Sequence, residues 1–180
     1  MSNDRTPVEE RRGIQLTALH PRDLVEGIWN GERDFSFRVL EYPESVGSYV
    51  DSGTGTINQY VDQNEEDLAR RPIGFQSSIL ANLYAPGIKL PFTNFTLSDL
   101  SDADLSRADL RRAIFAGANL GKVDFTLSDL TCADLRDASG LETAYFQEAN
   151  YDGAIILPKQ VELVKRIGLD VGRLDVRGYR

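Results

Sequence analysis

The sequence predicts a mainly β repeat protein, because its apolar residues recur at a spacing that neither an α-helix nor an ordinary strand produces. From Phe75 to Leu135 every fifth residue is large and apolar except Ala85, and the phase holds through thirteen repeats. Each of these apolar residues is the centre of a five-residue unit. The residue two positions before the centre also follows a pattern, since it is usually small. These residues are Thr93, Ser98, Ala103, Ala108, Ala113, Ala118, Val123, Ser128 and Ala133.

The residue just before each centre is mostly Asp or Asn, as at Asn94, Asn119 and the six aspartates named below. The stretches SDLSDADLSRADLRRAIFAGANL and SDLTCADLRD resemble the pentapeptide-repeat family, whose motif is Ala-(Asp/Asn)-Leu-X-X. The resemblance implies a right-handed quadrilateral β-helix in which each five-residue unit forms one side and about twenty residues complete a coil. The motif covers roughly half of the chain.

In such a β-helix the centres point toward the axis, and each stacks on the centre one coil away. One column would contain Phe75, Phe95, Phe115 and Leu135, with coils about 4.8 Å apart. We therefore predict a structural core made of the large centres. They are Phe75, Leu80, Leu90, Phe95, Leu100, Leu105, Leu110, Phe115, Leu120, Phe125, Leu130, Leu135, Phe146, Tyr151 and Ile156.

The phase breaks once, near Gly140. Beyond it the centres from Phe146 to Ile156 resume the spacing but are displaced by one residue, each with Ala two residues before. We interpret residues 139–141 as a bulged corner, because glycine tolerates the backbone angles that an insertion requires. The β-helix is then predicted over residues 73–156, which is close to four coils.

Residues 1–72 are predicted to form a mixed α/β cap of two short helices and a strand, which covers the open edge and apolar end of the β-helix. The first helix begins at Pro21 and ends near Asn30 and Gly31. The strand, residues 34–40, would place Phe35, Phe37 and Val39 on one face. The second helix, residues 58–71, would turn Tyr60, Val61 and Leu68 toward the core and the acids Asp62, Glu65, Glu66 and Asp67 toward water.

Residues 157–180 are predicted to form a carboxyl-terminal helix and a tail. Pro158 begins the helix, and Val161, Val164 and Ile167 form an apolar stripe before Gly168. The stripe is either a lid over the last coil or a homodimer contact, because DNA-mimicking members of the family pair through their carboxyl-terminal ends. Whether residues 169–180 pair as a strand or trail stays open.

The charge is uneven along the chain, whose formal net charge is −8. Residues 1–74 carry 8 basic and 14 acidic groups, residues 75–156 carry 6 and 11, and residues 157–180 carry 6 and 3. This acidic body argues against direct nucleic-acid binding, which requires Lys and Arg. No segment reaches the length of a membrane span, and the first residues lack the apolar stretch of a secretory signal, so we expect a cytoplasmic location.

No residue pattern predicts catalysis, a cofactor or a metal. His20 precedes a helix start and is expected to be exposed or to cap it, and the single Cys132 should face outward. The string Asp99, Asp102 and Asp104 lacks the glycine and the glutamate of a calcium loop. Arg111 and Arg112 form a small basic spot that surface solubility explains, and Leu97 and Leu127 should project from opposite sides.

The aspartates before the centres have a structural use, since a carboxylate can accept hydrogen bonds from nearby backbone amides at a tight corner. They also form a possible partner surface. This surface would comprise Asp99, Asp104, Asp109, Asp124, Asp129 and Asp134.

These features predict a non-catalytic scaffold that binds a protein partner of unknown identity, because solenoids commonly use extended faces for recognition. The alternative is the family's best-known activity, in which acidic members mimic DNA and bind or protect DNA gyrase in fluoroquinolone resistance. Four coils give a rod of about 20 Å, which matches only about six base pairs. An enzyme within residues 1–72 is disfavoured, since that segment is short for a separate core and pocket.

Overall fold

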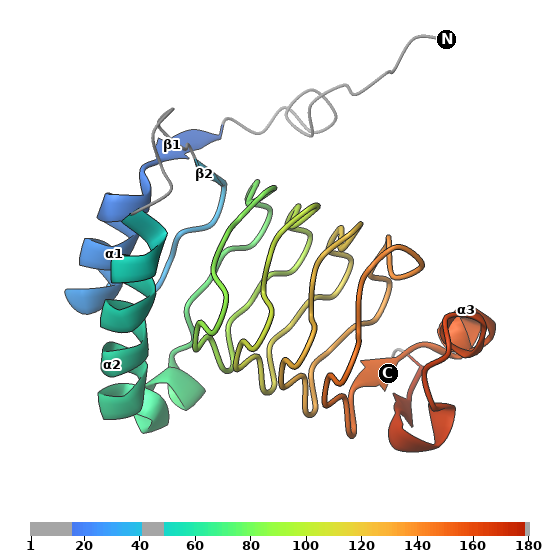
Figure 1. The fold of residues 1–180 in the computed structure, drawn as a ribbon. Coiled ribbons are helices and arrows are strands. Elements are labelled where there is room, and N and C mark those ends of the chain that lie inside the picture. Colours follow the sequence, from blue (N-terminus) through green and yellow to red (C-terminus); the bar gives the residue numbers. More distant parts are fainter. Residues whose placement is uncertain (1–15, 41–48, 179–180) are drawn as a thin grey trace, which may run out of the picture.

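The computed structural model describes residues 16–40 and 49–178, in which a stack of coils lies between helices at its two ends (Figure 1). Helices α1 and α2 cover one end, and α3 lies at the other. The elements in chain order are β1 (Thr17–Leu19), α1 (Pro21–Trp29), β2 (Arg38–Leu40), α2 (Tyr49–Arg70), β3 (Ile155–Ile156), the 3₁₀ turn η3 (Pro158–Gln160), α3 (Val161–Arg166), the 3₁₀ turn η4 (Val171–Arg173) and β4 (Asp175–Val176).

Parallel backbone bridges join residues twenty positions apart, so four five-residue units complete each coil. The bridges Gly74↔Asn94, Asn94↔Ile114 and Ile114↔Asp134 trace one side of the stack. Each side ends in a tight turn, as where Ser98 N–H donates to Phe95 C=O at 3.0 Å. The second residue after the centre, Leu97 in this unit, has a positive φ of 59°.

The interior is filled by the predicted centres. All of them are buried except Phe146, which is partly buried. Phe95 and Phe115 stack with ring centroids 5.1 Å apart, which confirms the predicted aromatic column. Phe75 stacks on Phe95 at 5.5 Å, and Phe35 from the amino-terminal region stacks on Phe75 at 5.5 Å.

The prediction of a one-faced strand over residues 34–40 is wrong, because this segment follows the five-residue period instead. Phe35 and Leu40 are buried, whereas Phe37 is 43% exposed and has a φ of 57° like the other turn residues. The bridges Asp34↔Gly74 and Val39↔Ile79 place the segment directly on the first coil. The parallel ladder therefore begins before residue 73, and α2 separates its first units from the rest.

Helix α1 starts at Pro21, as predicted, with His20 as its N-cap. Helix α2 begins at Tyr49 rather than at residue 58, ends at Arg70, and has a non-helical residue, Asn64, where two helical segments meet. Its apolar residues Ile57, Val61 and Leu68 are buried. The cap thus combines helices with two units of the coil.

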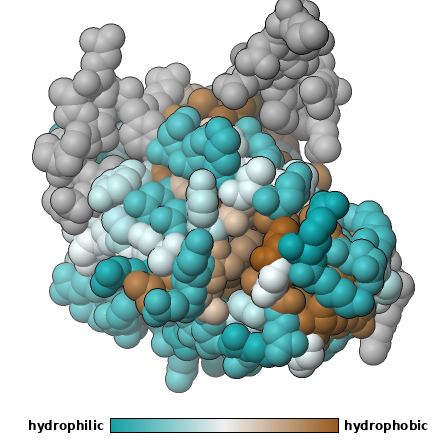
Figure 2. Space-filling model, turned by 45° about the vertical axis from the view of Figure 1, so that its right-hand side comes forward, coloured by the Kyte–Doolittle hydropathy of each residue, from teal (hydrophilic) through white to brown (hydrophobic). Residues whose placement is uncertain are grey.

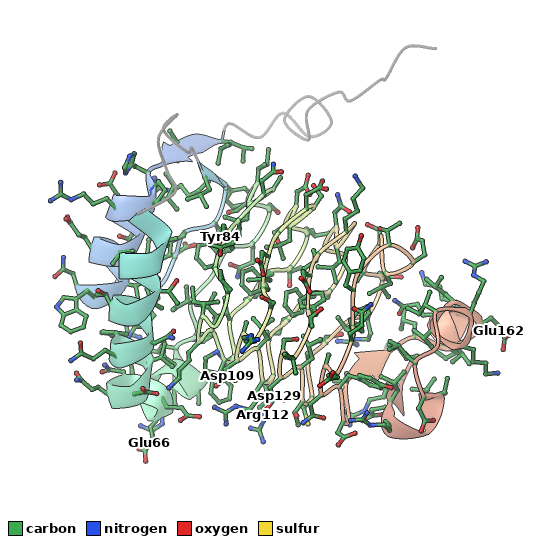
Figure 3. All side chains as sticks on the ribbon, viewed as in Figure 1. Glu66, Tyr84, Asp109, Arg112, Asp129 and Glu162 are labelled. Atoms are coloured by element: carbon green, nitrogen blue, oxygen red, sulfur yellow. The ribbon has the colours of Figure 1, made fainter. Side chains whose placement is uncertain are left out.

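The acids of α2 face water, as predicted, since Asp62, Glu65 and Glu66 are exposed and Asp67 is partly exposed. Glu66 is exposed and lies at the lower end of α2 (Figure 3). The other three form ion pairs with residues outside the helix. These pairs are Asp62 with Lys89 at 2.5 Å, Glu65 with Arg111 at 3.1 Å, and Asp67 with Arg33 at 3.0 Å.

The phase break contains one extra residue between Ser139 and Tyr145. Asn119 bridges Ser139, twenty positions on, but Asp124 bridges Tyr145, twenty-one positions on. Gly140 has a φ of 78°, and the following Leu141 is buried. The insertion is therefore absorbed at a glycine corner, at the place where the sequence indicates a bulge.

The carboxyl-terminal helix packs on the protein's own core. Val164 is buried in the core cluster, and Val161 and Ile167 are partly buried against it. Strand β4 pairs in parallel with β3, with Ile155 opposite Asp175 and Ile156 opposite Val176. The tail thus contributes a further strand at the coil spacing. Among the described residues, no helix has both the length and the apolar character needed to cross a membrane.

Candidate interaction surfaces

The outward side of each unit begins with the Asp or Asn that precedes the centre. Asp104 accepts a hydrogen bond from Ser106 N–H at 3.0 Å, Asp124 from Thr126 N–H at 2.8 Å, and Asp129 from Thr131 N–H at 3.0 Å. This bond to the backbone two residues on is the Asx-turn geometry. The structural use predicted for these carboxylates is confirmed.

The six candidate carboxylates do not lie on one surface. The bridges sort the outward residues into four rows, one on each side of the coil, and the six aspartates are divided among all four. We call the first row the tyrosine row; it comprises Tyr84, Asp104, Asp124 and Tyr145. The second, the lysine row, comprises Lys89, Asp109, Asp129 and Asn150. The other two rows are Val39, Ile79, Asp99, Asn119 and Ser139, and Asp34, Gly74, Asn94, Ile114, Asp134 and Ile155.

Two of the six carboxylates are paired with arginine. Asp109 accepts from Arg111 Nε at 2.8 Å and Nη2 at 2.7 Å. Asp134 accepts from Arg136 at 2.9 and 2.6 Å and is only 8% exposed. These hydrogen bonds raise the pKa of both guanidinium groups above its usual value, so both arginines stay charged.

Two others have uncharged side-chain partners. Asp99 accepts from Asn119 Nδ2 at 2.9 Å, and Asp129 accepts from the Thr131 hydroxyl at 2.5 Å. Asp104 and Asp124 differ, since their hydrogen bonds among the described residues come from the backbone alone. The tyrosine row therefore holds the two ladder carboxylates that are engaged only by their own turns.

The tyrosine row also carries exposed aromatic side chains, which the sequence interpretation missed. Tyr84 is 51% exposed and Tyr145 is 49% exposed. Their position just before a centre, in the phase of Asp104 and Asp124, is the signal that identifies them. Leu127, at the corner that follows Asp124, is 43% exposed. Leu97 projects from the turn of the Phe95 unit, two sides away, as predicted.

The basic spot predicted at Arg111 and Arg112 serves more than solubility. Arg111 bridges Asp109 and Glu65, so it ties α2 to the side of the coils. The Arg112 guanidinium lies 5.9 Å from the centroid of the Phe92 ring. Figure 3 shows Asp109, Asp129 and Arg112 along the lower edge of the coils, away from Tyr84.

The remaining chemical candidates are dispersed. His20 Nδ1 accepts from Arg22 N–H at 3.2 Å, which confirms the capping prediction, and Cys132 is exposed. Asp102 pairs with Lys122 at 3.3 Å, and within residues 16–40 and 49–178 no three His, Cys, Asp or Glu side chains form a group that could hold a metal.

A small cavity lies between α1, α2 and the first coil. Its volume is about 20 Å³, and its lining is entirely apolar, with Leu24, Ile28 and Ile57 facing Leu83 and Ile88. A void of this size holds no more than about one water molecule, and an apolar one stays dry.

Figure 2 shows hydrophilic side chains over most of the visible face, with apolar residues between them.

The family model for pentapeptide repeats matches residues 87–117 and 115–139. A comparison with curated proteins finds no match. Among solved structures, a pentapeptide repeat protein of the Arabidopsis thaliana thylakoid lumen is 35% identical, with a TM-score of 0.38 over 52% of this chain and 66% of that one. HetL, a pentapeptide repeat protein involved in heterocyst differentiation regulation in Nostoc sp. strain PCC 7120, is 18% identical. The TM-score is 0.34, and the match covers 71% of this chain and 42% of HetL.

QnrB1, a plasmid-mediated fluoroquinolone resistance protein, is 12% identical, with a TM-score of 0.25 over 82% of this chain and 61% of that one. The chain thus spans less than two thirds of the length of each of these three proteins.

Proposed function

Because this chain is a pentapeptide-repeat protein, with repeats over residues 87–139, we propose that it is a non-catalytic scaffold that acts by binding another protein. Pentapeptide-repeat proteins fold as right-handed β-helices, and the ladder at twenty-residue spacing belongs to that fold. The observation that carries the proposal is the filled interior, where the central centres from Phe95 to Leu130 are 0% exposed. Chemistry is thereby confined to the outward rows, which hold fixed side chains at regular spacing.

Catalysis finds little support in the described residues. An active site needs a pocket with convergent polar groups. The cavity at the first coil is apolar and has a volume of about 20 Å³. His20 serves as a helix cap, and the ladder carboxylates serve turns.

DNA mimicry of the kind that engages DNA gyrase is the competing function. It requires acidic groups arranged along a face as phosphates are along a duplex. Here the carboxylates are divided among four sides, and Arg111 and Arg136 neutralise two of them. This distribution weighs against the mimic and in favour of a partner that reads one side of the solenoid.

The proposal also takes α3 as a lid rather than a homodimer contact. The buried Val164 and the partly buried Val161 and Ile167 are already packed on the core of the same chain. A dimer through this stripe would first have to remove it from that core.

Affinity capture from native lysate tests the proposal, with the tagged full-length chain as bait and the unfolded Leu110→Asp variant as control. We expect the folded bait to retain a specific protein that the control does not. Repeated capture of nothing would overturn the scaffold function. A DNA gyrase supercoiling assay is run in parallel, and inhibition or protection at near-stoichiometric protein would replace the scaffold with the DNA mimic.

A further inference from the structure

The tyrosine row forms one straight line of side chains across neighbouring coils. Tyr84 bridges Asp104, Asp104 bridges Asp124, and Asp124 bridges Tyr145. At about 4.8 Å per coil the row extends about 14 Å. Both carboxylates therefore lie between two tyrosines that are about half exposed.

The candidate carboxylates on the other three sides all have side-chain partners. On the lysine row, Lys89 pairs with Asp62 and Arg111 pairs with Glu65, both from α2. Asp134 is buried beneath its pair with Arg136, and Asp99 is bonded to Asn119. The tyrosine row thus combines exposed aromatic rings with carboxylates that no described side chain engages.

The carboxylates of this row are oriented before any partner arrives. Oδ1 of Asp104 and of Asp124 accepts a backbone N–H of its own turn. That bond fixes the carboxylate and leaves the second oxygen for an outside donor. Ordering of these groups therefore costs little on binding.

The charge and the rings together specify the partner's chemistry. A guanidinium group can donate to a carboxylate and also stack on the face of a tyrosine, whereas an ammonium group is a strongly hydrated point charge. Next to the row, Asp102 and Glu148 add negative charge and Lys122 and Arg107 add positive charge, so these four cancel and the two carboxylates of the row leave the balance acidic. Leu127 supplies an apolar contact at the adjoining corner.

We propose that the tyrosine row is the docking surface of the scaffold, and that its occupant is an arginine-bearing segment of a protein partner. This inference rests on the proposed scaffold function and adds to it a surface and a partner chemistry. The tyrosines flank the segment, and its arginines pair with Asp104 and Asp124.

The first test measures the full-length chain binding a fluorescent nona-arginine peptide at 150 mM salt, with nona-lysine for comparison. The double variant Asp104→Asn/Asp124→Asn keeps the acceptor of each turn and removes two charges. Its matched control is Asp109→Asn/Asp129→Asn, one side away. We expect the tyrosine-row variant to weaken nona-arginine binding at least about tenfold and the control to weaken it less than about twofold.

Tyr84→Ala/Tyr145→Ala is expected to reduce the preference for nona-arginine over nona-lysine. Equal weakening by both Asp-to-Asn doubles would show non-specific charge attraction and overturn the proposal. Melting curves confirm that each variant is folded before binding is measured.

The second test repeats the affinity capture with the two doubles as baits. Loss of the captured protein with Asp104→Asn/Asp124→Asn alone supports the tyrosine row. If both double variants retain the captured protein equally, the tyrosine row is not the docking surface, although the scaffold function stands. If the wild-type bait captures nothing, the scaffold function itself is overturned. A wild-type dimer in light scattering that becomes a monomer in Asp104→Asn/Asp124→Asn would identify a second copy of this chain as the occupant and overturn the partner assignment.

Discussion

Each centre side chain is enclosed by its own unit, by the neighbouring units of the coil and by the coils on either side. Leu110 is 0% exposed, and the coils on either side place Leu90 and Leu130 against it. Such a position provides no water and no partner for a charge. The centre is therefore the position at which a single substitution affects the whole stack.

Leu110→Asp is expected to abolish the folded state, because an unpaired buried carboxylate costs more than about 4 kcal/mol. The measurement is thermal melting followed by circular dichroism. Leu127→Asp is the matched control, since Leu127 is 43% exposed and occupies a turn whose φ of 61° Asp tolerates. A Leu110→Asp variant that melts with the wild type would show that the axis is not closed to water.

The turn position two residues after a centre is a second constraint on single residues. Arg107, Lys122 and Cys132, none of them glycine, hold φ near 58° there. A left-handed residue costs about 1–2 kcal/mol. Hydrogen bonds between coils offset this cost, as where Arg107 N–H donates to Thr126 C=O at 2.8 Å.

Gly140 is the corner at which a side chain cannot be accommodated. Its φ is 78°, and an added Cβ would lie 2.4 Å from Gly121 N and 2.6 Å from Gly121 Cα. Gly140→Ala is expected to cost at least about 3 kcal/mol in urea unfolding, from strain together with overpacking against backbone.

Gly87→Ala separates these two causes, because Gly87 has a φ of 69° but no atom within 4 Å of an added Cβ. It should cost about 1 kcal/mol. Equal losses in the two variants would mean that the close approach of Gly121 contributes nothing.

At the scale of elements, each end of the ladder is completed by a side-chain amide. Asn58 of α2 accepts Lys89 N–H at 2.7 Å and donates to Gly87 C=O at 2.9 Å. At the opposite end, Gln160 accepts Leu157 N–H at 2.8 Å and donates to Leu135 C=O at 2.9 Å. Asn58 Oδ1 thus replaces the backbone acceptor that a preceding coil supplies to the equivalent amide, as Ile88 C=O does for Asp109 N–H. Gln160 Oε1 also accepts Asp137 N–H at 3.3 Å, whose equivalent Gly117 N–H donates to the next coil at Arg136 C=O.

Asn58→Ala is expected to destabilise the protein by about 1–3 kcal/mol, because Lys89 N–H and Gly87 C=O lose their partner at a partly buried edge. The measurement is the midpoint of urea unfolding. Gln59→Ala is the matched control, since Gln59 is an exposed neighbour on the same helix, and it should change stability by less than about 0.5 kcal/mol. Equal effects would assign the loss to helix propensity rather than to the cap.

The elements differ in how far the sequence could predict them. The coils were predictable because thirteen units repeat one chemical pattern. Phe35 and Leu40 carry the same spacing, but two isolated units also satisfy the pattern of a short strand. The start of α2 was missed because Ser52, Gly53 and Gly55 are poor helix formers, so local propensity does not predict a helix there.

The interaction surface was less predictable than the core. Counting aspartates before the centres identified turn-forming residues on every side but did not separate Asp104 from Asp109, which Arg111 of the same unit engages. Arg111 also pairs with Glu65, and that pair depends on the placement of α2, a helix that lies outside the repeat. Tyr84 and Tyr145 needed the coil register, including the extra residue near Gly140, before they could be placed in one row.

At the scale of the whole molecule, stability should vary along the stack, because each coil contacts only its neighbours. The column from Phe35 to Phe115 joins the amino-terminal units to the central coils. Strand β4 lies at the far end, where Val176 is 41% exposed. Opening should therefore begin at the carboxyl-terminal end and reach the centre last.

Native-state hydrogen exchange tests this gradient. The amides of Leu110 and Phe115, which donate to Asp129 and Asp134 C=O, should exchange slowest, by opening of the whole stack. Those of Asp175 and Arg177, which donate to Ala154 and Ile156 C=O, should exchange at least about a hundredfold faster, through local fraying of β4. At the opposite end, Asn58→Ala should accelerate hydrogen exchange of the Lys89 amide much more than that of the Phe115 amide, because it removes the acceptor of Lys89 N–H. Equal protection from the first coil to β4 would instead show that the solenoid and its caps open as a single unit, and that nearest-neighbour coupling between coils is too strong for one end to open alone.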